Sequence, residues 1–442
     1  MTNSEVLVPW RDAPAAHQPE WPDRAALREV LARLSAAPGL VTPRACDDLR
    51  HRLAEVASGR AFALQGGDCA ETFDGATPRA IQDKTKTLLQ MAVVLTHAAA
   101  MPIVKIGRMA GQYAKPRSSS TETRDGLALP VYRGDAVNGY PFDAAARRPD
   151  PARLWRMYEA SRATLDIVDG YARNGYASLD QLHRWNRDFV ANSPSGARYE
   201  EVAYEIDRAL RFMRACGAQP EELRSAEIFA SHEGLLLDYE DTLTRTDHST
   251  GRDYATSGHM LWIGERTRAL DGAHVAYFRS IANPIGVKLG PTTTPAEVRS
   301  YVDILDPDRE PGRLTFITRM GARQIRDRLP ALIRAAQAVG GVSVWICDPM
   351  HGNTFTASSG HKTRLFADVV DEVRGFFEVH RALGTHPGGV HVEFTGEDVT
   401  ECVGGSNEVL VDHLHHRYES TCDPRLNRSQ SLDLAFDIAE LL

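Results

Sequence analysis

Four separated segments of this chain each contain a residue that can ligate a divalent metal ion. They are Cys69 in LQGGDCAE, His351 in CDPMHGN, Glu393 in VHVEFTGED and Asp423 in ESTCDPRLN. A thiolate, an imidazole and two carboxylates form a borderline donor set that suits Mn, Co, Fe or Zn better than Ca or Mg. Each residue alone has an ordinary packing role as an alternative. Taken together, and because only a closed tertiary scaffold could gather them, they predict a catalytic rather than a structural metal site.

A second group of residues is cationic and stands out in a chain with a formal net charge of −8. Its members are Lys105, Arg108, Lys115, Arg117, Arg266, Lys288, Arg319, Lys362 and Arg364. Lys105 and Lys288 lie within otherwise apolar segments, where we expect their side chains to point inward or upward. Some of the group should pair with acids such as Asp68, Glu265 and Asp348. The remainder predict an anionic substrate that carries two or more phosphate or carboxylate groups.

The elements that must position these residues alternate between strand-like and helix-like patterns. Eight short β-branched or aromatic runs have the length of strands, at 61–67, 101–107, 226–231, 259–264, 285–290, 314–319, 343–348 and 389–395. Amphipathic segments at 78–100, 294–305 and 323–340 are typical of helices, and Thr294 begins a capping box. Eight such units predict an α/β fold of the (β/α)8 TIM-barrel type, with a doubly wound open sheet as the alternative.

The polar residues that follow these runs favour the barrel. Barrel enzymes place their chemistry at the carboxyl ends of the strands, where the loops converge. All four predicted metal ligands fall at such an end or in the loop beyond the last strand. We therefore expect the metal site and the cationic residues to meet on one face of the barrel.

Two stretches depart from simple alternation. Residues 1–55 precede the barrel and are predicted to be an extension that packs on the barrel, 56–442, or on a partner subunit. Roughly 115 residues separate the second and third strands, far more than an ordinary connection, and predict a helical insertion at about 150–217. Within it, SLDQLHRWNRDF at 178–189, with Tyr176 beside it, is predicted to form an aromatic effector site and subunit contact; plain cover for the barrel is the alternative.

Composition excludes several classes of function. The chain has 442 residues, 43% hydrophobic and 25% charged, and its negative charge gives no general footprint for nucleic acid. Six cysteines without a CxxC pair indicate reduced thiols, and the lack of an apolar span or leader-like N-terminus predicts a cytoplasmic protein. Walker A, GxGxxG, HExxH and GxSxG motifs are absent from the sequence, so nucleotide hydrolysis, dinucleotide redox chemistry and serine hydrolysis have no support.

Long motifs spread over nearly the whole chain resemble those of the type II, plant-like 3-deoxy-D-arabino-heptulosonate 7-phosphate (DAHP) synthases. The segments that carry this resemblance include ALQGGDCAETF, VKIGRMAGQYAKPRSS, HMLWIGERTRALDGAH, ANPIGVKLGPT, RMGARQIRDRLP, CDPMHGNT and CDPRLNRSQSLDLAF. The resemblance implies a transferase, 3-deoxy-7-phosphoheptulonate synthase, which opens the shikimate pathway toward chorismate and the aromatic amino acids. Phosphoenolpyruvate, D-erythrose 4-phosphate and water would give DAHP and phosphate, and this reaction would require no organic cofactor.

The same resemblance assigns roles to individual residues. The metal ligands fall on Cys69, His351, Glu393 and Asp423, with Mn or Co favoured and Zn or Fe as alternatives. The phosphoenolpyruvate contacts fall on Arg108, Lys115, Trp262, Glu265, Arg266, Lys288 and Arg319. Arg117 and Ser118 in the KPRS run resemble part of the erythrose 4-phosphate site. Lys362, which belongs to the cationic group, is predicted to be a further substrate contact. Arg108, Lys288 and Glu265 are the expected catalytic residues, the last two as candidates to organise the attacking water.

Three residues depart from the family pattern around the metal histidine, namely Ile346, Phe355 and His361. They leave open an amino-DAHP synthase of a secondary-metabolite pathway, which would use an imino or amino analogue of erythrose 4-phosphate. A non-catalytic scaffold that binds chorismate mutase is a third reading, which the intact ligand set disfavours. The resemblance further implies a homodimer or homotetramer, an aromatic amino acid effector, and chorismate mutase as a partner.

Overall fold

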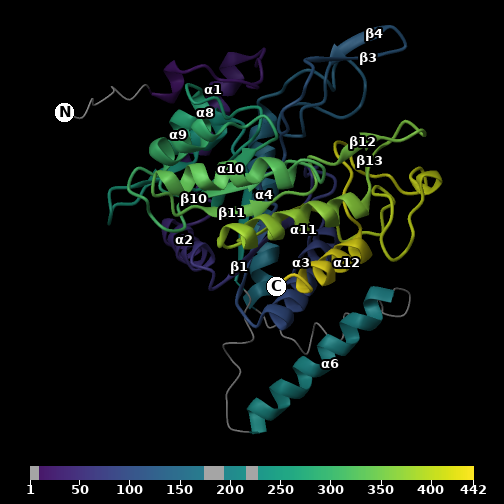
Figure 1. Ribbon diagram of the computed structural model, residues 1–442. Helices are drawn as coiled ribbons and strands as arrows, with labels where there is room; N and C mark the ends of the chain where they lie inside the picture. Colours follow the sequence, from purple (N-terminus) through teal and green to yellow (C-terminus); the bar gives the residue numbers. More distant parts are fainter. Residues whose placement is uncertain (1–8, 174–193, 216–226) are drawn as a thin grey trace.

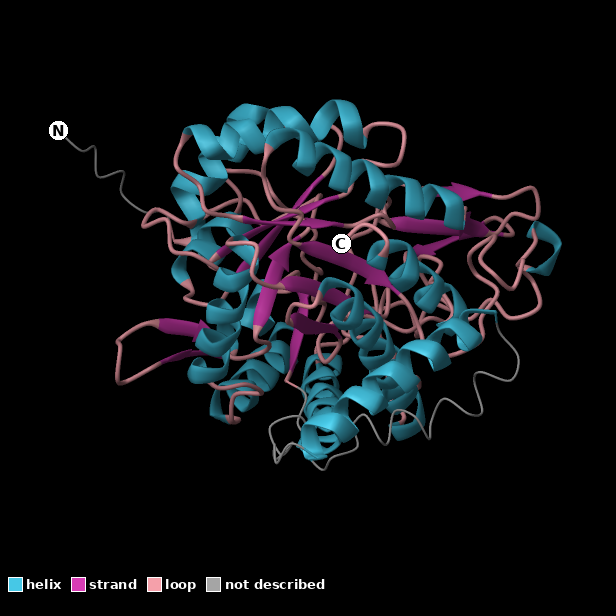
Figure 2. Ribbon diagram, turned by 60° about the horizontal axis from the view of Figure 1, so that its bottom comes forward, coloured by secondary structure: helices cyan, strands magenta, loops and turns pink. Residues whose placement is uncertain are grey.

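Eight parallel strands close into a barrel in the computed structural model, which describes residues 9–173, 194–215 and 227–442 (Figures 1 and 2). The barrel strands are β1 (Phe62–Gly67), β2 (Ile103–Arg108), β5 (Ile228–Glu233), β8 (Met260–Ile263), β9 (Ile285–Leu289), β10 (Leu314–Thr318), β11 (Val344–Cys347) and β14 (Gly389–Glu393). They neighbour one another in chain order, and β14 pairs with β1 to close the ring. The (β/α)8 prediction is confirmed, and the open sheet is excluded.

Helices surround the barrel and connect its strands (Figure 2). They are α3 (Pro78–Ala99), α4 (Ala152–Arg173), α6 (Pro194–Ala215), α7 (Leu237–Thr242), α8 (Ala273–Ser280), α9 (Pro295–Leu305), α10 (Ile325–Ala338), α11 (Phe366–Leu383) and α12 (Arg428–Ala439). The three helices predicted at 78–100, 294–305 and 323–340 are thus α3, α9 and α10. The capping box of α9 is formed as expected, because the Glu297 amide donates to Thr294 Oγ1 at 3.2 Å.

Alternate strand residues face the barrel interior and the surrounding helices. Ala63, Val104 and Ile346 belong to an inner apolar cluster, whereas Leu64 and Ile103 pack in the outer layer. Higher in the barrel the interior becomes polar, because Gln65 Nε2 donates to Ser231 Oγ at 2.9 Å and Gln65 Oε1 lies 2.8 Å from a ring nitrogen of His391. The polar layer leads directly to the residues at the carboxyl ends of the strands.

Lys105 does not reach that polar layer. It pairs in register with Leu64 and Ile228, two residues of the outer layer, and its Nζ donates to the carbonyl of Ile103 at 3.2 Å. The expectation that Lys105 points inward or upward is therefore wrong. Strand periodicity explains the error, since Arg108 faces inward and Lys105 lies three residues away on the opposite side.

The segments before β1 form η1 (Trp10–Asp12), α1 (Arg24–Ala36) and α2 (Pro43–Ala57). Asp23 caps α1 by accepting from the amides of Ala25 and Ala26. Helix α2 places Leu49, Leu53 and Val56 in the inner apolar cluster of the barrel. It therefore covers the end of the barrel from which the strands start.

The long connection between β2 and β5 begins with a hairpin of β3 (Thr121–Arg124) and β4 (Leu127–Pro130), which projects from the body (Figure 1). Helix α4 then packs on α1 and α3, and α6 contacts α3 and α12. The predicted effector segment 178–189, with Tyr176, lies outside the described residues. Among the described helices, none is long and apolar enough to cross a membrane.

Shorter elements complete the fold at the edges of the barrel. They are the hairpin of β6 (Thr244–Thr246) and β7 (Asp253–Ala255), the hairpin of β12 (Thr354–Thr356) and β13 (Lys362–Arg364), and η3 (Val411–His413). The β12–β13 hairpin follows the metal-ligand candidate His351. It therefore belongs to the face of the barrel on which the polar residues collect.

Candidate active site and metal-binding cluster

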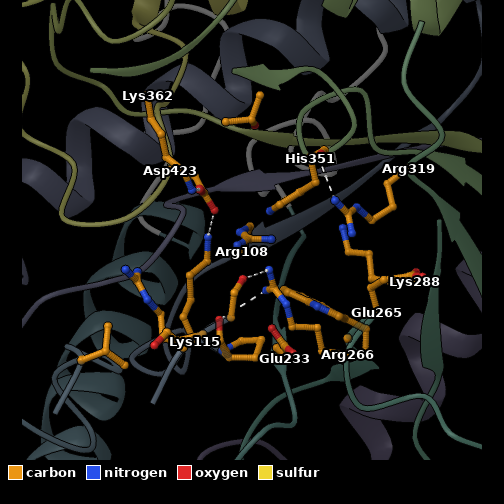
Figure 3. A pocket seen from close by; sticks show the side chains of 18 of the residues that line it. Arg108, Lys115, Glu233, Glu265, Arg266, Lys288, Arg319, His351, Lys362 and Asp423 are labelled. Carbon is orange, nitrogen blue, oxygen red and sulfur yellow. Dashed lines mark hydrogen bonds and ion pairs between the residues drawn. The ribbon is translucent and has the colours of Figure 1, made fainter. Parts of the chain in front are cut away.

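A cavity of about 530 Å³ lies at the carboxyl ends of the barrel strands (Figure 3). Its lining contains all ten predicted substrate-binding residues and two of the predicted metal ligands. These residues are Arg108, Lys115, Arg117, Ser118, Trp262, Glu265, Arg266, Lys288, Arg319 and Lys362, with His351 and Asp423. The other two ligand candidates, Cys69 and Glu393, are buried next to the cavity, where they contact Lys115. The structure thus brings the two predicted groups together.

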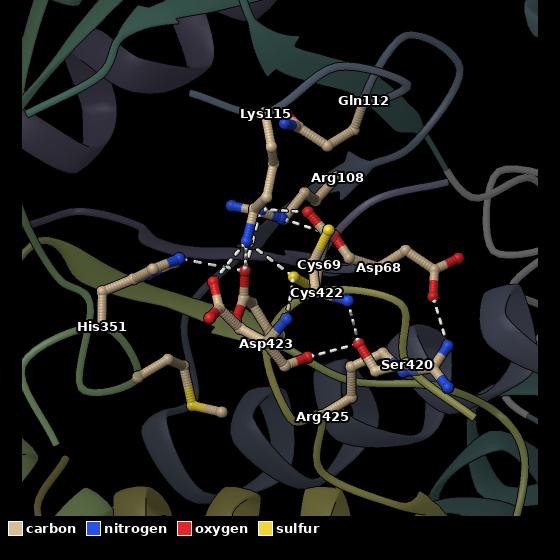
Figure 4. Close-up of polar contacts among 12 residues, drawn as sticks. Asp68, Cys69, Arg108, Gln112, Lys115, His351, Ser420, Cys422, Asp423 and Arg425 are labelled. Carbon is tan, nitrogen blue, oxygen red and sulfur yellow. Dashed lines mark hydrogen bonds and ion pairs between the residues drawn. The ribbon is translucent and has the colours of Figure 1, made fainter. Parts of the chain in front are cut away.

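Three of the four ligand candidates form one compact cluster (Figure 4). The Sγ atom of Cys69 and one carboxylate oxygen each of Glu393 and Asp423 lie within 4.8 Å of one another. His351 adjoins the cluster, with its Nε2 atom 3.0 Å from Glu393 Oε1. Cys69 follows β1, His351 follows β11, Glu393 ends β14 and Asp423 lies in the loop beyond, so the barrel closure between β14 and β1 makes the cluster.

The electrostatics of the cluster suit a cation. Burial alone would raise the pKa of Glu393, but His351, Lys115 and Arg108 together hold the pKa of this carboxyl well below its usual range. Lys115 Nζ already contacts Cys69 Sγ at 2.6 Å and Asp423 Oδ2 at 2.5 Å. An ammonium group therefore sits where two carboxylates and the Cys69 sulfur converge. The donor set fits a divalent metal ion, for which this lysine would compete.

His351 is oriented from behind by a buried carboxylate. Its Nδ1 atom lies 2.7 Å from Asp348 Oδ2, which leaves Nε2 to face Glu393 and the cluster. Asp348 also pairs with Lys288, and its pKa stays well below the usual range despite burial, because His351 and Lys288 oppose the effect of burial. A carboxylate that fixes the ring of a histidine is a common support for a metal ligand.

The arginines of the cavity differ in how many of their N–H donors already have a partner in the protein. Arg108 is buried and bound on several sides, to Glu393 Oε1 at 2.9 Å and to the carbonyls of Asp68 and Cys69. Arg319 donates from Nη2 to the carbonyl of His351 at 2.8 Å, while its buried Nε has no partner among the described residues. Arg108 is therefore fixed in place by its partners, whereas Arg319 keeps an N–H donor that has none among the described residues.

Lys288 differs from the arginines because its charge is easier to lose. Burial, reinforced by Arg108, lowers the pKa of Lys288 to about 8, although Asp348 opposes the shift. Its Nζ lies 5.8 Å from the centre of the Trp262 ring, and Arg108 Cζ lies 5.2 Å from the same centre. Trp262 thus separates and supports two cations on the floor of the cavity.

The acids expected to pair with the cations do so only in part. Lys288 pairs with Asp348 as expected, but Glu265 pairs with Arg268 at 3.1 Å and Asp68 pairs with Lys84 and Arg425. Glu393 and Asp423 are instead the main partners within the cationic group. Their partners there are Arg108, Lys115, Lys362 and Arg364. The metal-ligand candidates and the cations of the cavity are therefore joined by ion pairs.

One cavity residue escaped the sequence reasoning. Glu233 ends β5 and lines the cavity, and its buried Oε1 atom has no partner among the described residues. Burial raises the pKa of Glu233 even though Lys115 and Arg108 act in the opposite direction. Gly264 makes room for it, since a Cβ atom there would collide with the Glu233 carboxylate. The only sequence signal was its position at a strand end in SHEG.

The three residues that depart from the family pattern lie off the cavity wall. Ile346 is fully buried in the inner apolar cluster of the barrel. Phe355 is partly exposed on β12, and His361 stacks near Tyr418 with ring centres 5.2 Å apart. Thr354 and Lys362, their neighbours, line the cavity instead. The departures therefore add no contact that would recognise an amino group.

Comparisons with known proteins agree with this geometry. The model of the Class-II DAHP synthetase family matches residues 6–439. The chain is 63% identical over 432 residues to a phospho-2-dehydro-3-deoxyheptonate aldolase of Streptomyces coelicolor, covering 98% of this chain and 96% of that one. It is 56% identical over 436 residues to the phospho-2-dehydro-3-deoxyheptonate aldolase AroG of Mycolicibacterium smegmatis, covering 97% and 93%.

A solved phospho-2-dehydro-3-deoxyheptonate aldolase from Francisella tularensis SCHU S4 is a more distant likeness. It aligns with 100% of this chain and 98% of its own at 13% identity, with a TM-score of 0.46. This similarity is too low to support a structural argument.

The fold and the site together define a class of protein. A closed (β/α)8 barrel with a cationic cavity and a cluster of potential metal ligands at the carboxyl ends of its strands is the architecture of a barrel enzyme for an anionic substrate. Within that class, the chain belongs to the class-II DAHP synthetase family. The predictions of the family and of a DAHP synthase are confirmed.

Proposed function

We propose that the chain condenses phosphoenolpyruvate with D-erythrose 4-phosphate and water to give DAHP and phosphate, with a bound divalent metal ion. One observation carries the proposal: Asp423 belongs both to the cavity lining and to the cluster of metal-ligand candidates, and Lys115 of the cavity contacts Cys69 and Asp423 of that cluster. An anionic substrate in the cavity would therefore lie beside a cation held by the cluster. Family membership supplies the reaction, and this geometry supports it.

The metal site of the proposal consists of Cys69, His351, Glu393 and Asp423. A bound Mn²⁺ or Co²⁺ ion would supply Lewis acidity to the aldehyde oxygen of erythrose 4-phosphate, with Zn²⁺ or Fe²⁺ as alternatives. Asp348 orients His351, and Arg108 and Arg364 hold Glu393 in its anionic form. Lys115 Nζ would have to withdraw from Cys69 when the ion binds, which frees its charge for substrate.

The phosphoenolpyruvate site of the proposal uses the cations on the cavity floor. Arg108, Lys288 and Arg319 hold the phosphate and carboxylate, and Trp262 supports two of these cations from one side. Fixing the enol phosphate in this way aligns its C3 atom with the aldehyde carbon and stabilises charge. Glu265, Arg266 and Lys115 complete the set.

Water then adds to C2, and phosphate leaves with cleavage of its bond to that carbon. Lys288 or Glu265 organises the water in this scheme. Glu265 Oε2 is buried and has no partner among the described residues, so it has an acceptor available. Glu233 offers a third carboxylate near the same cations. No organic cofactor takes part in the proposal.

The erythrose 4-phosphate site of the proposal lies toward the mouth of the cavity. Arg266 Nη2 donates to Ser118 Oγ at 3.0 Å, so the KPRS loop and the loop after β8 converge there. Arg117 and Lys362 stand on the same lining. The amino-DAHP alternative has no contact in its favour, and the connected ligand cluster argues against an inactive chorismate mutase scaffold.

A phosphate-release assay with phosphoenolpyruvate and erythrose 4-phosphate tests the proposal. We expect activity that excess EDTA abolishes and that Mn²⁺ or Co²⁺ restores. His351→Ala should lose metal, measured by elemental analysis, while circular dichroism stays unchanged. Full activity in excess EDTA would refute the metal site, and turnover of the amino analogue alone would replace DAHP by amino-DAHP as the product.

The proposal includes regulation and assembly as open expectations. Oligomeric state, as a homodimer or homotetramer, is measured by light scattering, and a complex with chorismate mutase by co-elution. Titration of Trp, Phe and Tyr against activity and binding heat tests the aromatic effector. Absence of binding at millimolar concentration would reduce the 178–189 segment to cover for the barrel.

A further inference from the structure

One fully buried carboxyl group lies outside the barrel wall and serves two loops of the site at once. Glu372 is on α11, and its Oε1 atom accepts the amides of Met320 and Gly321, each at 2.8 Å. Its Oε2 atom accepts the side-chain amide of Asn353 at 2.8 Å. Among the described residues, Glu372 forms no ion pair with a lysine or arginine. Its whole hydrogen-bonding capacity is therefore directed at the loops after β10 and β11.

These two loops carry different parts of the proposed machinery. Met320 follows Arg319, a phosphoenolpyruvate contact, and Asn353 is two residues beyond His351, a metal ligand. Asn353 also joins the loops directly, because its Oδ1 atom accepts the amide of Ala322 at 3.0 Å. Its Nδ2 atom donates to the Pro349 carbonyl at 2.8 Å, within its own loop.

The backbones of the two loops are in direct contact. A Cβ atom at Gly352 would collide with the backbone of Gly321, so no side chain can stand between them. Gly321 has φ +82°, a conformation that glycine adopts without strain. On the cavity side, Arg319 Nη2 donates to the His351 carbonyl at 2.8 Å. The loops therefore behave as one unit that Glu372 holds from behind.

A carboxyl group in this position is costly to keep. Burial raises the pKa of Glu372 to about 8, against the amides of Gly321 and Met320, which stabilise its charge. An unpaired buried carboxyl destabilises a fold unless its hydrogen bonds offset the cost. Here the three donors that offset it all belong to the two site loops. The cost is thus tied to the shape of the site rather than to packing in the core.

We propose that Glu372 is a positioning residue that couples the metal-binding loop of His351 to the anion-binding loop of Arg319. The inference rests on the proposed function, because it concerns the metal and phosphoenolpyruvate sites. It adds that one side chain outside the cavity sets the geometry of both. Loss of the hydrogen bond between Glu372 and Asn353 should therefore weaken the binding of the metal ion and of phosphoenolpyruvate together.

Glu372→Gln is the variant of choice, with Glu378→Gln as a matched control. The amide of Gln keeps one acceptor oxygen for Met320 and Gly321 but turns an N–H donor toward Asn353 Nδ2, which is also a donor. Glu378 lies on the same helix, is solvent-exposed and pairs with Arg326, so its variant makes the same Glu-to-Gln change outside the site. The purified full chain is used throughout.

Three quantities separate positioning from plain structural support. Metal affinity is measured by competition with a chelating dye, phosphoenolpyruvate affinity by calorimetry, and KM and kcat by phosphate release. We expect Glu372→Gln to weaken metal binding and to raise the KM for phosphoenolpyruvate, each by about tenfold, as is usual when a residue that supports a ligand is lost. Glu378→Gln should match wild type in all three.

A second variant keeps the test decisive if Glu372→Gln folds poorly. Asn353→Ala removes the same link from the other loop and should give the same paired losses. The double variant should be little worse than Asn353→Ala alone, because the link to Glu372 is already broken in that variant. Losses that multiply would contradict the coupling. If the variants of Glu372 and Asn353 bind metal and phosphoenolpyruvate within twofold of Glu378→Gln and differ only in a lower Tm, the positioning role is overturned. A wild-type chain that binds neither ligand would overturn the proposed function instead.

Discussion

Arg108 connects the two halves of the site at the scale of single residues. It donates to Glu393, a proposed metal ligand, and it lies over Trp262 on the floor of the anion cavity. Lys115 makes the same connection through Cys69 and Asp423. A protein with a net charge of −8 therefore retains an attractive site for anions, because lysines and arginines outnumber acids on the cavity lining.

Lys288 should set the alkaline limit of activity. Its pKa of about 8 means that its positive charge is present below that pH and is lost as the pH rises through it. We expect kcat/KM for phosphoenolpyruvate to fall above about pH 8. Lys288→Arg should be slower but should extend this limb to higher pH, because a guanidinium group stays protonated.

Unfolding of the protein would not explain this loss of activity at high pH. The pKa of Lys288 is lower in the fold than its ordinary value of 10.5, so the unfolded chain binds more protons between these pH values. This group therefore makes the fold more stable, not less, as the pH rises from about 8 to 10.5. A pH–rate profile with Tm recorded at each pH checks both statements, and an identical alkaline limb in Lys288→Arg would rule out the assignment.

Cys69 should also be open to oxidation. Burial and a hydrogen bond with Cys422 raise the pKa of the Cys69 thiol well above its usual value, whereas the same hydrogen bond lowers the pKa of Cys422 to about 6. Hydrogen peroxide should oxidise the pair to a disulfide, with loss of two protons and two electrons, and so remove one metal ligand. Peptide mapping should detect the Cys69–Cys422 link together with loss of bound metal. Cys422→Ser should keep its metal under the same treatment, and failure to find the cross-linked peptide in wild type would count against the prediction.

At the scale of elements, the β12–β13 hairpin links the mouth of the cavity to the cluster. Lys362 begins β13 with a half-exposed side chain and contacts Asp423 Oδ1 at 2.9 Å. Arg364, two residues on, is fully buried and contacts Glu393 Oε2 at 2.8 Å. A strand of three residues thus carries one cation that substrate can reach and one that only supports the cluster.

Lys362→Ala should therefore affect the second substrate more than the first. We expect a rise in the KM for erythrose 4-phosphate of several-fold, consistent with about 1 kcal/mol for an exposed charge, and little change in the KM for phosphoenolpyruvate. Lys86→Ala, on α3, is the control for loss of a lysine. The ratio of kcat/KM for erythrose 4-phosphate to that for its amino analogue is measured for all three proteins. Equal changes in the KM values for erythrose 4-phosphate and phosphoenolpyruvate would show that Lys362 does not belong to the aldehyde site.

The sequence predicts these elements unevenly, for physical reasons. All eight barrel strands were predicted to within about two residues of their bounds, because each is an apolar run that ends in polar residues. The hairpins escaped prediction, since strands of three or four residues are too short to carry an apolar pattern, and β3 and β12 have no buried residue. Lys105 was placed on the wrong side because a charge in a strand does not reveal its own direction.

The sequence also predicts some features of the site and not others. Its ligand candidates could be predicted because the carboxyl ends of barrel strands converge, which places Cys69, Glu393 and their neighbours together. The contact of Lys115 with Cys69 and Asp423 could not, because it depends on the path of a loop. Glu372 gave no signal either, since a glutamate in an amphipathic helix usually faces solvent, and only the packed structure shows it buried against two loops.

At the scale of the whole molecule, opposite ends of the barrel have different tasks. The carboxyl ends of the strands carry the charged cavity, whereas α2 covers the other end with Leu49, Leu53 and Val56. The polar layer around Gln65 and His391 separates these ends inside the barrel. A change at the covered end should therefore alter stability without reaching the chemistry.

Leu53→Ala tests this separation. Leu53 is fully buried in the inner apolar cluster, so its truncation should lower the free energy of unfolding by about 2 to 5 kcal/mol, through lost burial and the cavity left behind. Leu127→Ala is the matched control, because that leucine is 54% exposed on β4 and its loss should change stability by no more than about 0.5 kcal/mol. Urea unfolding gives the stabilities, and phosphate release at a temperature where both variants are folded gives kcat.

We expect kcat of Leu53→Ala within twofold of wild type, because α2 lies at the end of the barrel opposite the cavity. A large drop in kcat without unfolding would mean that the closed end of the barrel helps to shape the site after all.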